Sequence, residues 1–184
     1  ELRSRGWFSE RPEPDLMQWL DIVALGTICD SVPLTGLNRA LAAQGLKAMA
    51  ARANPGLTAL SDVGRINERP TAYHAGFILG PRINAGGRIG APDLGVRLLT
   101  TTDADEATSL AMKLDGLNAE RQAIEKAVLD AALRAGEEQV GRNCLVLAGE
   151  GWHPGVIGIV ASRVVERFNR PAFVIALQDG IGKG

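Results

Sequence analysis

The feature that most constrains the fold is an apolar stripe of helical period between Asp103 and Gly136. Its apolar positions recur at intervals of three and four residues, and include Ala107, Leu110, Ala111, Leu114, Leu117, Ile124 and Val128. The sequence Asp103-Ala-Asp-Glu106 has the form of a capping box, which predicts where the helix begins. About 33 residues at 1.5 Å each give a helix of about 50 Å, longer than one small core needs. The pattern predicts a strut between two lobes, with Arg121 either on a solvated face or in an ion pair.

The chain before this strut is predicted to be helical. Apolar residues recur at helical spacing from Asp15 to about Asp30, and again over residues 36–52, where Gly45 should interrupt the helix and Leu37 should face the core. Further helices are predicted over residues 57–63 and 70–79. The single His74 in the last of these is expected to be structural.

After Gly136 the apolar period changes to that of strands. The pattern predicts a strand over residues 144–148, a glycine-rich loop over 149–155, a helix over 156–168 and a second strand over 172–177. Two strands joined by a helix should be parallel with a right-handed crossover. The fold class is therefore α/β: a mainly helical first part and a long connecting helix, followed by a partial βαβ lobe.

Composition limits how this chain could attract a charged partner. Its 184 residues include 20 basic and 21 acidic side chains, so a polyanion could be held only by a local cluster. No charged-then-apolar leader and no uninterrupted run of about 18 apolar residues is present, so we expect a cytoplasmic protein with no membrane span. Cys29 and Cys144 lack metal-type spacing and are expected to be reduced core thiols.

Residues 80–92 combine unusual backbone with unusual charge, in the sequence Gly-Pro-Arg-Ile-Asn-Ala-Gly-Gly-Arg-Ile-Gly-Ala-Pro. Four glycines and two prolines predict a loop between helices rather than a helix or strand. The planar guanidinium groups of Arg82 and Arg88 suit phosphate oxygens, and Asn84 can both donate and accept. The alternative is a tight turn whose arginines pair with carboxylates and fasten two lobes.

Asp30 closes an apolar run over residues 22–28. A buried carboxylate there would need a cation or several hydrogen-bond donors, whereas the alternative is a turn or capping aspartate before Pro33. Asp21 lies nine residues earlier, on the opposite face of a helix at about 100° per residue, and is not expected to share a ligand with Asp30.

The predicted loop before helix 156–168 carries Trp152 and His153. A helix N-terminus favours an anion, Trp152 offers a stacking surface and His153 a donor. Alternatively, Trp152 fills the core of the lobe and His153 caps the helix. Arg163, two turns into the helix, faces either a cleft or the solvent, and Lys183 lies in a glycine-rich terminal stretch.

Three stretches, in order, resemble the RecJ family, which are single-strand-specific 5′ to 3′ DNA exonucleases of the DHH phosphoesterase superfamily. In chain order they are Leu-Gly-Thr-Ile-Cys-Asp-Ser-Val-Pro-Leu over 25–34, the stretch 80–92 quoted above, and Gly-Trp-His-Pro-Gly-Val-Ile-Gly-Ile-Val-Ala-Ser-Arg over 151–163. In the second stretch, Gly87 replaces the alanine that is usual in the family. The resemblance implies the C-terminal part of a DHH catalytic domain over 1–65 and a helical connector over 66–139. Residues 140–184 would then be the N-terminal part of a DHHA1 domain.

The same resemblance implies a metal-dependent exonuclease that hydrolyses single-stranded DNA in repair and recombination, in the bacterial cytoplasm, with DNA-repair proteins as further partners. It makes Asp30 a ligand of manganese or magnesium, and it places substrate contacts at Arg82, Asn84, Arg88 and His153, with Trp152, Arg163 and Lys183 as additional candidates. The chain lacks the family's Asp-His-His motif, so this part alone is expected to be inactive. Two alternatives stay open: a DHH-family phosphoesterase acting on nucleotides or short oligonucleotides, and a non-catalytic nucleic-acid-binding module.

Overall fold

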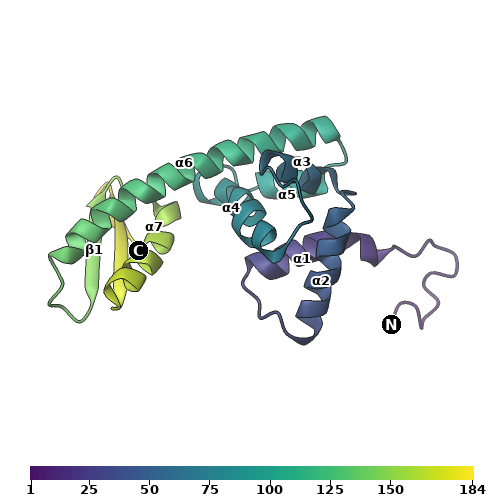
Figure 1. The fold of residues 1–184 in the computed structure, drawn as a ribbon, viewed down its shortest axis with the longest axis horizontal. Helices are drawn as coiled ribbons and strands as arrows, with labels where there is room; N and C mark the ends of the chain where they lie inside the picture. Colours follow the sequence, from purple (N-terminus) through teal and green to yellow (C-terminus); the bar gives the residue numbers. More distant parts are fainter.

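The computed structural model describes residues 1–184 and contains two lobes joined by one long helix (Figure 1). The first lobe is helical, and its elements are η1 (Leu16–Trp19, a 3-10 helix), α1 (Leu20–Cys29), α2 (Gly36–Ala50), α3 (Pro55–Val63), η2 (His74–Leu79, a π-helix), α4 (Gly80–Ile89) and α5 (Leu94–Thr100). Its core of 14 buried residues has fully buried leucines at its centre, namely Leu60, Leu79, Leu98 and Leu114.

Close packing of α1 against α2 explains one difference from the sequence prediction. Gly45 does not interrupt α2, because the glycine serves the approach of the two helices: a Cβ there would lie 2.0 Å from the carbonyl oxygen of Leu20. The prediction that Leu37 faces the core is also wrong, since its side chain is 72% exposed. The ring of His74 is buried and accepts a hydrogen bond from the Thr71 backbone N–H, which is consistent with the expected structural role.

Helix α6 (Ala104–Glu137) confirms the predicted strut. Its 34 residues correspond to about 51 Å and run along both lobes (Figure 1). Near its start it contributes Ala107, Leu110, Ala111 and Leu114 to the first core, and towards its end it contributes Val128 and Ala132 to a second core of ten buried residues. One continuous helix therefore belongs to two separate cores.

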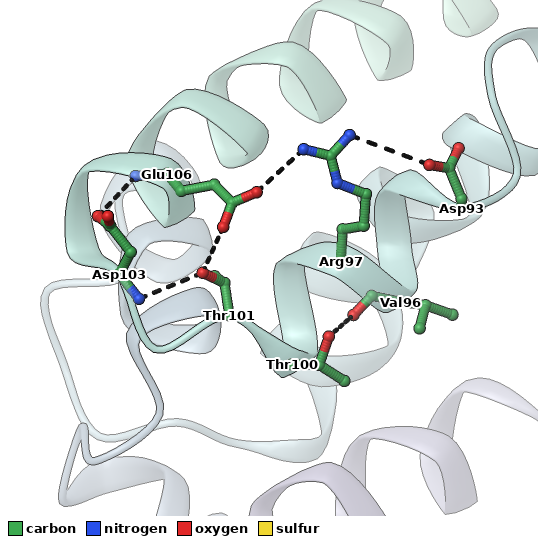
Figure 2. Close-up of polar contacts among 7 residues, drawn as sticks. All are labelled: Asp93, Val96, Arg97, Thr100, Thr101, Asp103 and Glu106. Carbon is green, nitrogen blue, oxygen red and sulfur yellow. Dashed lines mark hydrogen bonds and ion pairs between the residues drawn. The ribbon is translucent and has the colours of Figure 1, made fainter.

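The N-terminus of α6 forms only half of the predicted capping box. The Asp103 carboxylate accepts hydrogen bonds from the N–H groups of Asp105 and Glu106, at 2.8 and 3.1 Å. The Glu106 side chain does not return to the Asp103 N–H; it accepts instead from the Thr101 hydroxyl at 2.6 Å and from Arg97 at 2.9 Å (Figure 2). These bonds tie the end of α5 to the start of α6.

The second lobe is the predicted βαβ unit with one added strand. Strands β1 (Leu145–Glu150) and β2 (Ala172–Gln178) are parallel and are connected by α7 (Pro154–Phe168). The added strand β3 (Ile181–Lys183) runs antiparallel to β2. Asp179 and Gly180, both at positive φ, form the tight turn between them, and this Asp-Gly pair is the sequence signal that could have predicted the hairpin.

Both cysteines are free and half-buried. None of the helices combines the length and the apolar character that crossing a bilayer requires.

Candidate nucleic-acid interface

Residues 80–89 of the stretch predicted as a loop form helix α4, so the prediction is wrong for all but its last three residues. Three of the four glycines of the stretch, all except Gly87, allow close packing instead of an irregular backbone. A Cβ at Gly80 would lie 2.5 Å from the Cys29 sulfur, and one at Gly90 would lie 2.7 Å from the Leu117 side chain. Pro81 lies in the first turn, where a missing N–H is tolerated.

Helical geometry gives α4 a polar face directed at the junction of the two lobes. Pro81, Asn84 and Arg88 are spaced by three and four residues and therefore share one side of the helix. They line a groove of about 310 Å³ together with Arg121, Gln122 and Glu125 from α6 and Ile159 and Arg163 from α7. Three elements from both lobes thus bring three arginines, one glutamate and two amide side chains into one groove.

Asn84 also lines a second, neighbouring pocket of about 190 Å³ that contains Asp30. Asp30 is the C-cap of α1, and its exposed carboxylate has no hydrogen bond and no ion pair. A carboxylate at a helix C-terminus is unfavourable because the helix dipole is negative there. Asp30 is thus the C-cap by position only, because its side chain makes no hydrogen bond to the helix end. The carboxylate is available to an external cation or hydrogen-bond donor.

Asp21 lies apart from Asp30, as its helical spacing predicted. Its side chain is buried, and it lines a different pocket beside Trp19 and Asn54. Burial raises the pKa of Asp21, and the hydrogen bond from the Ile22 N–H to its carboxylate offsets part of that effect.

Arg82 points away from the groove. Its Nε donates to the Asp115 carboxylate of α6 at 2.9 Å, and its Nη1 donates to the Ile78 carbonyl oxygen at 2.7 Å. Only 18% of the side chain is exposed. This matches the alternative in which an arginine pairs with a carboxylate, although Arg82 fastens α4 to α6 rather than one lobe to the other.

Arg88 forms the contact between the lobes. Its Nη1 donates to the Gly155 carbonyl oxygen in the first turn of α7 at 3.1 Å, while the side chain stays exposed. The backbones also touch, since a Cβ at Gly155 would lie 2.2 Å from the Arg88 carbonyl oxygen. The C-terminal end of α4 and the N-terminal end of α7 therefore meet at the groove.

The remaining candidate residues lie outside the groove. His153 caps α7, with Nδ1 accepting from the Gly155 N–H at 3.0 Å. Trp152 is half-buried, lies over Gly149 and packs against the second core. These positions match the structural alternatives for both residues. Lys183 is exposed on β3, and it does not line the groove either.

Beyond the two alternatives given for Arg121, the polar cluster in the middle of α6 was not predicted from the sequence. Arg121 is buried at 9% exposure and pairs with Glu125 at 2.5 Å, which confirms the ion pair and excludes the solvated face. It also donates to the Asn118 side-chain oxygen at 3.0 Å. The spacing of three and four residues between these polar side chains was the available signal, because it interrupts the apolar stripe.

Comparison with known proteins shows what this chain is similar to. No protein-family model matches it. Over 193 residues it is 45% identical to the single-stranded-DNA-specific exonuclease RecJ of Dickeya dadantii, and 42% identical to that of Escherichia coli K12, with the whole chain covered in both comparisons. By sequence, the chain matches a segment of RecJ. It spans about a third of the length of these curated relatives, namely 34% and 33%.

Solved structures support the same assignment for this RecJ-type segment. A crystal structure of RecJ from Thermus thermophilus in complex with Mn²⁺ matches it with a TM-score of 0.81 at 40% identity, covering 89% of this chain and 24% of that one. A structure of exonuclease RecJ bound to manganese matches with a TM-score of 0.81 at 38% identity, covering 92% and 43%. The predicted α/β class and the family resemblance are thereby confirmed.

Proposed function

We propose that this segment forms part of a metal-dependent 5′ to 3′ exonuclease acting on single-stranded DNA in repair and recombination, in the bacterial cytoplasm. Residues 1–65 would belong to its DHH catalytic domain, 66–139 to the connector and 140–184 to its DHHA1 domain. One observation carries the proposal: Asn84, Arg88 and Arg163 line one groove where the lobes meet, and Asn84 also lines the pocket of Asp30.

The groove has the local charge that the chain as a whole lacks. Three arginines and one glutamate line it, in a chain whose formal net charge is -1. Arg88 uses one nitrogen on Gly155 and keeps the rest of its guanidinium for a ligand. Planar guanidinium groups bind phosphate oxygens with two parallel hydrogen bonds, so a sugar-phosphate backbone is the ligand that suits these walls.

Asp30 is the residue that we assign to the metal. Its carboxylate is free of other partners and can supply one oxygen ligand, but no three His, Cys, Asp or Glu side chains converge within residues 1–184. Magnesium prefers octahedral coordination, so the other ligands would come from elsewhere in a RecJ-type protein. When bound, a divalent ion activates water and neutralises charge on the phosphodiester. The residues of this segment would hold the strand and contribute one ligand, and the segment alone would not hydrolyse DNA.

Binding of a 5′-phosphorylated oligothymidylate, followed by fluorescence anisotropy over a range of salt concentrations, tests the groove. Arg88→Gln should weaken binding and flatten the plot of log K against log[salt] by about 0.7, the value for one lost phosphate contact on a single strand. Lys113→Gln, an exposed position on α6 outside the groove, removes the same charge and is the control. Equal losses in both variants, or none in either, would refute the assignment.

The single carboxylate of Asp30 also favours the second candidate, a non-catalytic nucleic-acid-binding module, for the segment on its own. Titration with Mn²⁺ separates the two functions in a full-length RecJ-type protein. Asp30→Asn should weaken metal binding and abolish hydrolysis while DNA affinity is kept. Replacing the long strand with a dinucleotide tests the short-substrate alternative, since only a groove that follows the backbone gains affinity with length.

A further inference from the structure

The polar cluster in the middle of α6 lies where the two cores end. Leu117 is the last apolar residue of α6 packed on the first core, and Ile124 is the first packed on the second. Between them, Asn118 and Arg121 are buried, at 4% and 9% exposure. Buried charge is unfavourable unless it is paired and hydrogen-bonded, so the contacts of this cluster show what it stabilises.

Arg121 is held from both sides along its own helix. Its Nε and Nη2 donate to the Asn118 side-chain oxygen at 3.3 and 3.0 Å, and its Nη1 donates to Oε2 of Glu125 at 2.5 Å. The side chains of Arg121 and Glu125 are only 10% and 12% exposed. One carboxylate oxygen of Glu125 is therefore committed to Arg121.

The other carboxylate oxygen of Glu125 faces a different helix. Oε1 lies 3.6 Å from Nε of Arg163 in α7. Arg163 is 56% exposed, lines the groove and makes no side-chain hydrogen bond, so both of its Nη groups are free for a ligand. The ion pair at Nε draws that side of the guanidinium group towards Glu125 and leaves both Nη groups, at the far end of the fork, available.

We propose that Glu125 is a positioning residue for the groove: it bridges Arg121 and Arg163 and directs the Nη groups of Arg163 at a phosphate. The inference rests on the proposed function for the identity of the ligand. This role also explains why a carboxylate, Glu125, lies in a groove that we propose binds a polyanion. By its charge alone, Glu125 would repel the phosphates.

The two roles of Glu125 predict opposite results for the same substitution. Glu125→Gln keeps the shape and one acceptor oxygen, but removes one negative charge, so the net charge of the groove becomes more positive by one. If Glu125 acted only through its charge, the variant would bind the oligothymidylate more tightly and with a steeper salt dependence. If it positions Arg163, we expect binding to weaken by about threefold to tenfold, as for the loss of one net hydrogen bond.

A double-mutant cycle shows whether the effect passes through Arg163. In an Arg163→Gln background, Glu125→Gln should cause no further loss of affinity, because its target is absent. Thermal unfolding of each variant measures any loss of stability from the altered Arg121 pair. A similar loss of affinity in both backgrounds, or tighter binding by the single variant, would overturn the inference.

A measurement without DNA separates the inference from the proposed function. The Nε–H NMR signal of Arg163 should show a restrained side chain in the wild type and a mobile one in Glu125→Gln, with Arg88 as the internal control. An unchanged mobility of Arg163 would overturn the inference. Absence of DNA binding by the wild type would instead refute the proposed function, and the NMR result would still decide the role of Glu125.

Discussion

Gly155→Ala is the substitution that most directly tests the contact between the lobes. The added Cβ would lie 2.2 Å from the carbonyl oxygen and 2.9 Å from the carbonyl carbon of Arg88, whereas ordinary contacts begin at 3.4 Å. The ends of α4 and α7 would therefore have to separate by about 1.2 Å, because a backbone group cannot rotate out of the way. Overpacking of this kind costs about 1–3 kcal/mol. Alanine regains at most about 1 kcal/mol as a better helix former than glycine.

The expected consequence is local opening, since each lobe keeps its own core. With the full gain from alanine, the net cost is at most about 2 kcal/mol, which corresponds to amide exchange up to roughly 30 times faster where the lobes meet. Hydrogen exchange followed by NMR reports this at the Gly90 N–H, which donates to the Gly86 carbonyl oxygen at the end of α4.

Gly158→Ala is the matched control for this experiment. It lies in the same helix, but a Cβ there meets no heavy atom within 4 Å. We expect it to stabilise the protein by about 0.5–1 kcal/mol and to leave exchange at Gly90 unchanged. If Gly155→Ala behaved like Gly158→Ala, the two helix ends would not be in backbone contact in solution, and the reasoning would be refuted.

Three further predictions concern stability and need only thermal unfolding at several pH values. Hydrogen bonds from Thr101 and Arg97 hold the pKa of Glu106 below 4.5 in the folded protein. The ionised carboxylate therefore stabilises the fold above pH 4.5, and this stabilisation is lost as the pH falls through the lower pKa of the folded state. Glu106→Gln should make the unfolding temperature depend less on pH in this acid range. Burial raises the pKa of Asp21 above 3.8 in the folded protein, so the stability of the fold falls as the pH rises from 3.8 through the pKa of the folded state. Asp21→Asn should therefore raise the unfolding temperature at neutral pH. An unchanged unfolding temperature would contradict this. Gly87→Ala, at an exposed helical position with no heavy atom within 4 Å, should stabilise by about 0.5–1 kcal/mol, and a destabilised variant would contradict the helical assignment of α4.

The elements that the sequence predicted well are those specified by local signals. Helix α6 has a capping aspartate and a long stripe of one period, and the βαβ unit has two short apolar runs around an amphipathic helix. Neither prediction required knowledge of distant neighbours. The β3 hairpin could have been added to them, because Asp179-Gly180 is also a local signal.

The prediction for α4 failed because a glycine has two structural uses that look alike in sequence. It permits positive φ in a loop, and it permits close approach between packed elements. The neighbours that decide the matter for Gly80 and Gly90 are Cys29 and Leu117, which are distant in sequence. Sequence alone could not show which use applied.

Because a loop was predicted over residues 80–92, the different roles of Arg82 and Arg88 were not predicted either. Arg82 and Arg88 are six residues apart, which on a helix is about 600° of rotation, so they point about 120° apart. A loop carries no such angular relation, and the two side chains were therefore assigned one role. In the helix, Arg82 turns to Asp115 and Arg88 turns to the groove beside Asn84.

The groove depends on a contact that a ligand would reinforce. Its walls belong to different lobes, Asn84 and Arg88 on α4 and Arg163 on α7, and these lobes are joined by α6 and by the meeting of α4 with α7 at Gly155. A strand that contacts both walls would bind the closed arrangement in preference to the open one. At a concentration 100 times its Kd, such a ligand stabilises the closed arrangement by about 2.7 kcal/mol, more than the cost expected for Gly155→Ala. Saturating oligothymidylate should therefore return exchange at Gly90 in that variant to the wild-type rate, whereas a strand held by one wall alone would leave it fast.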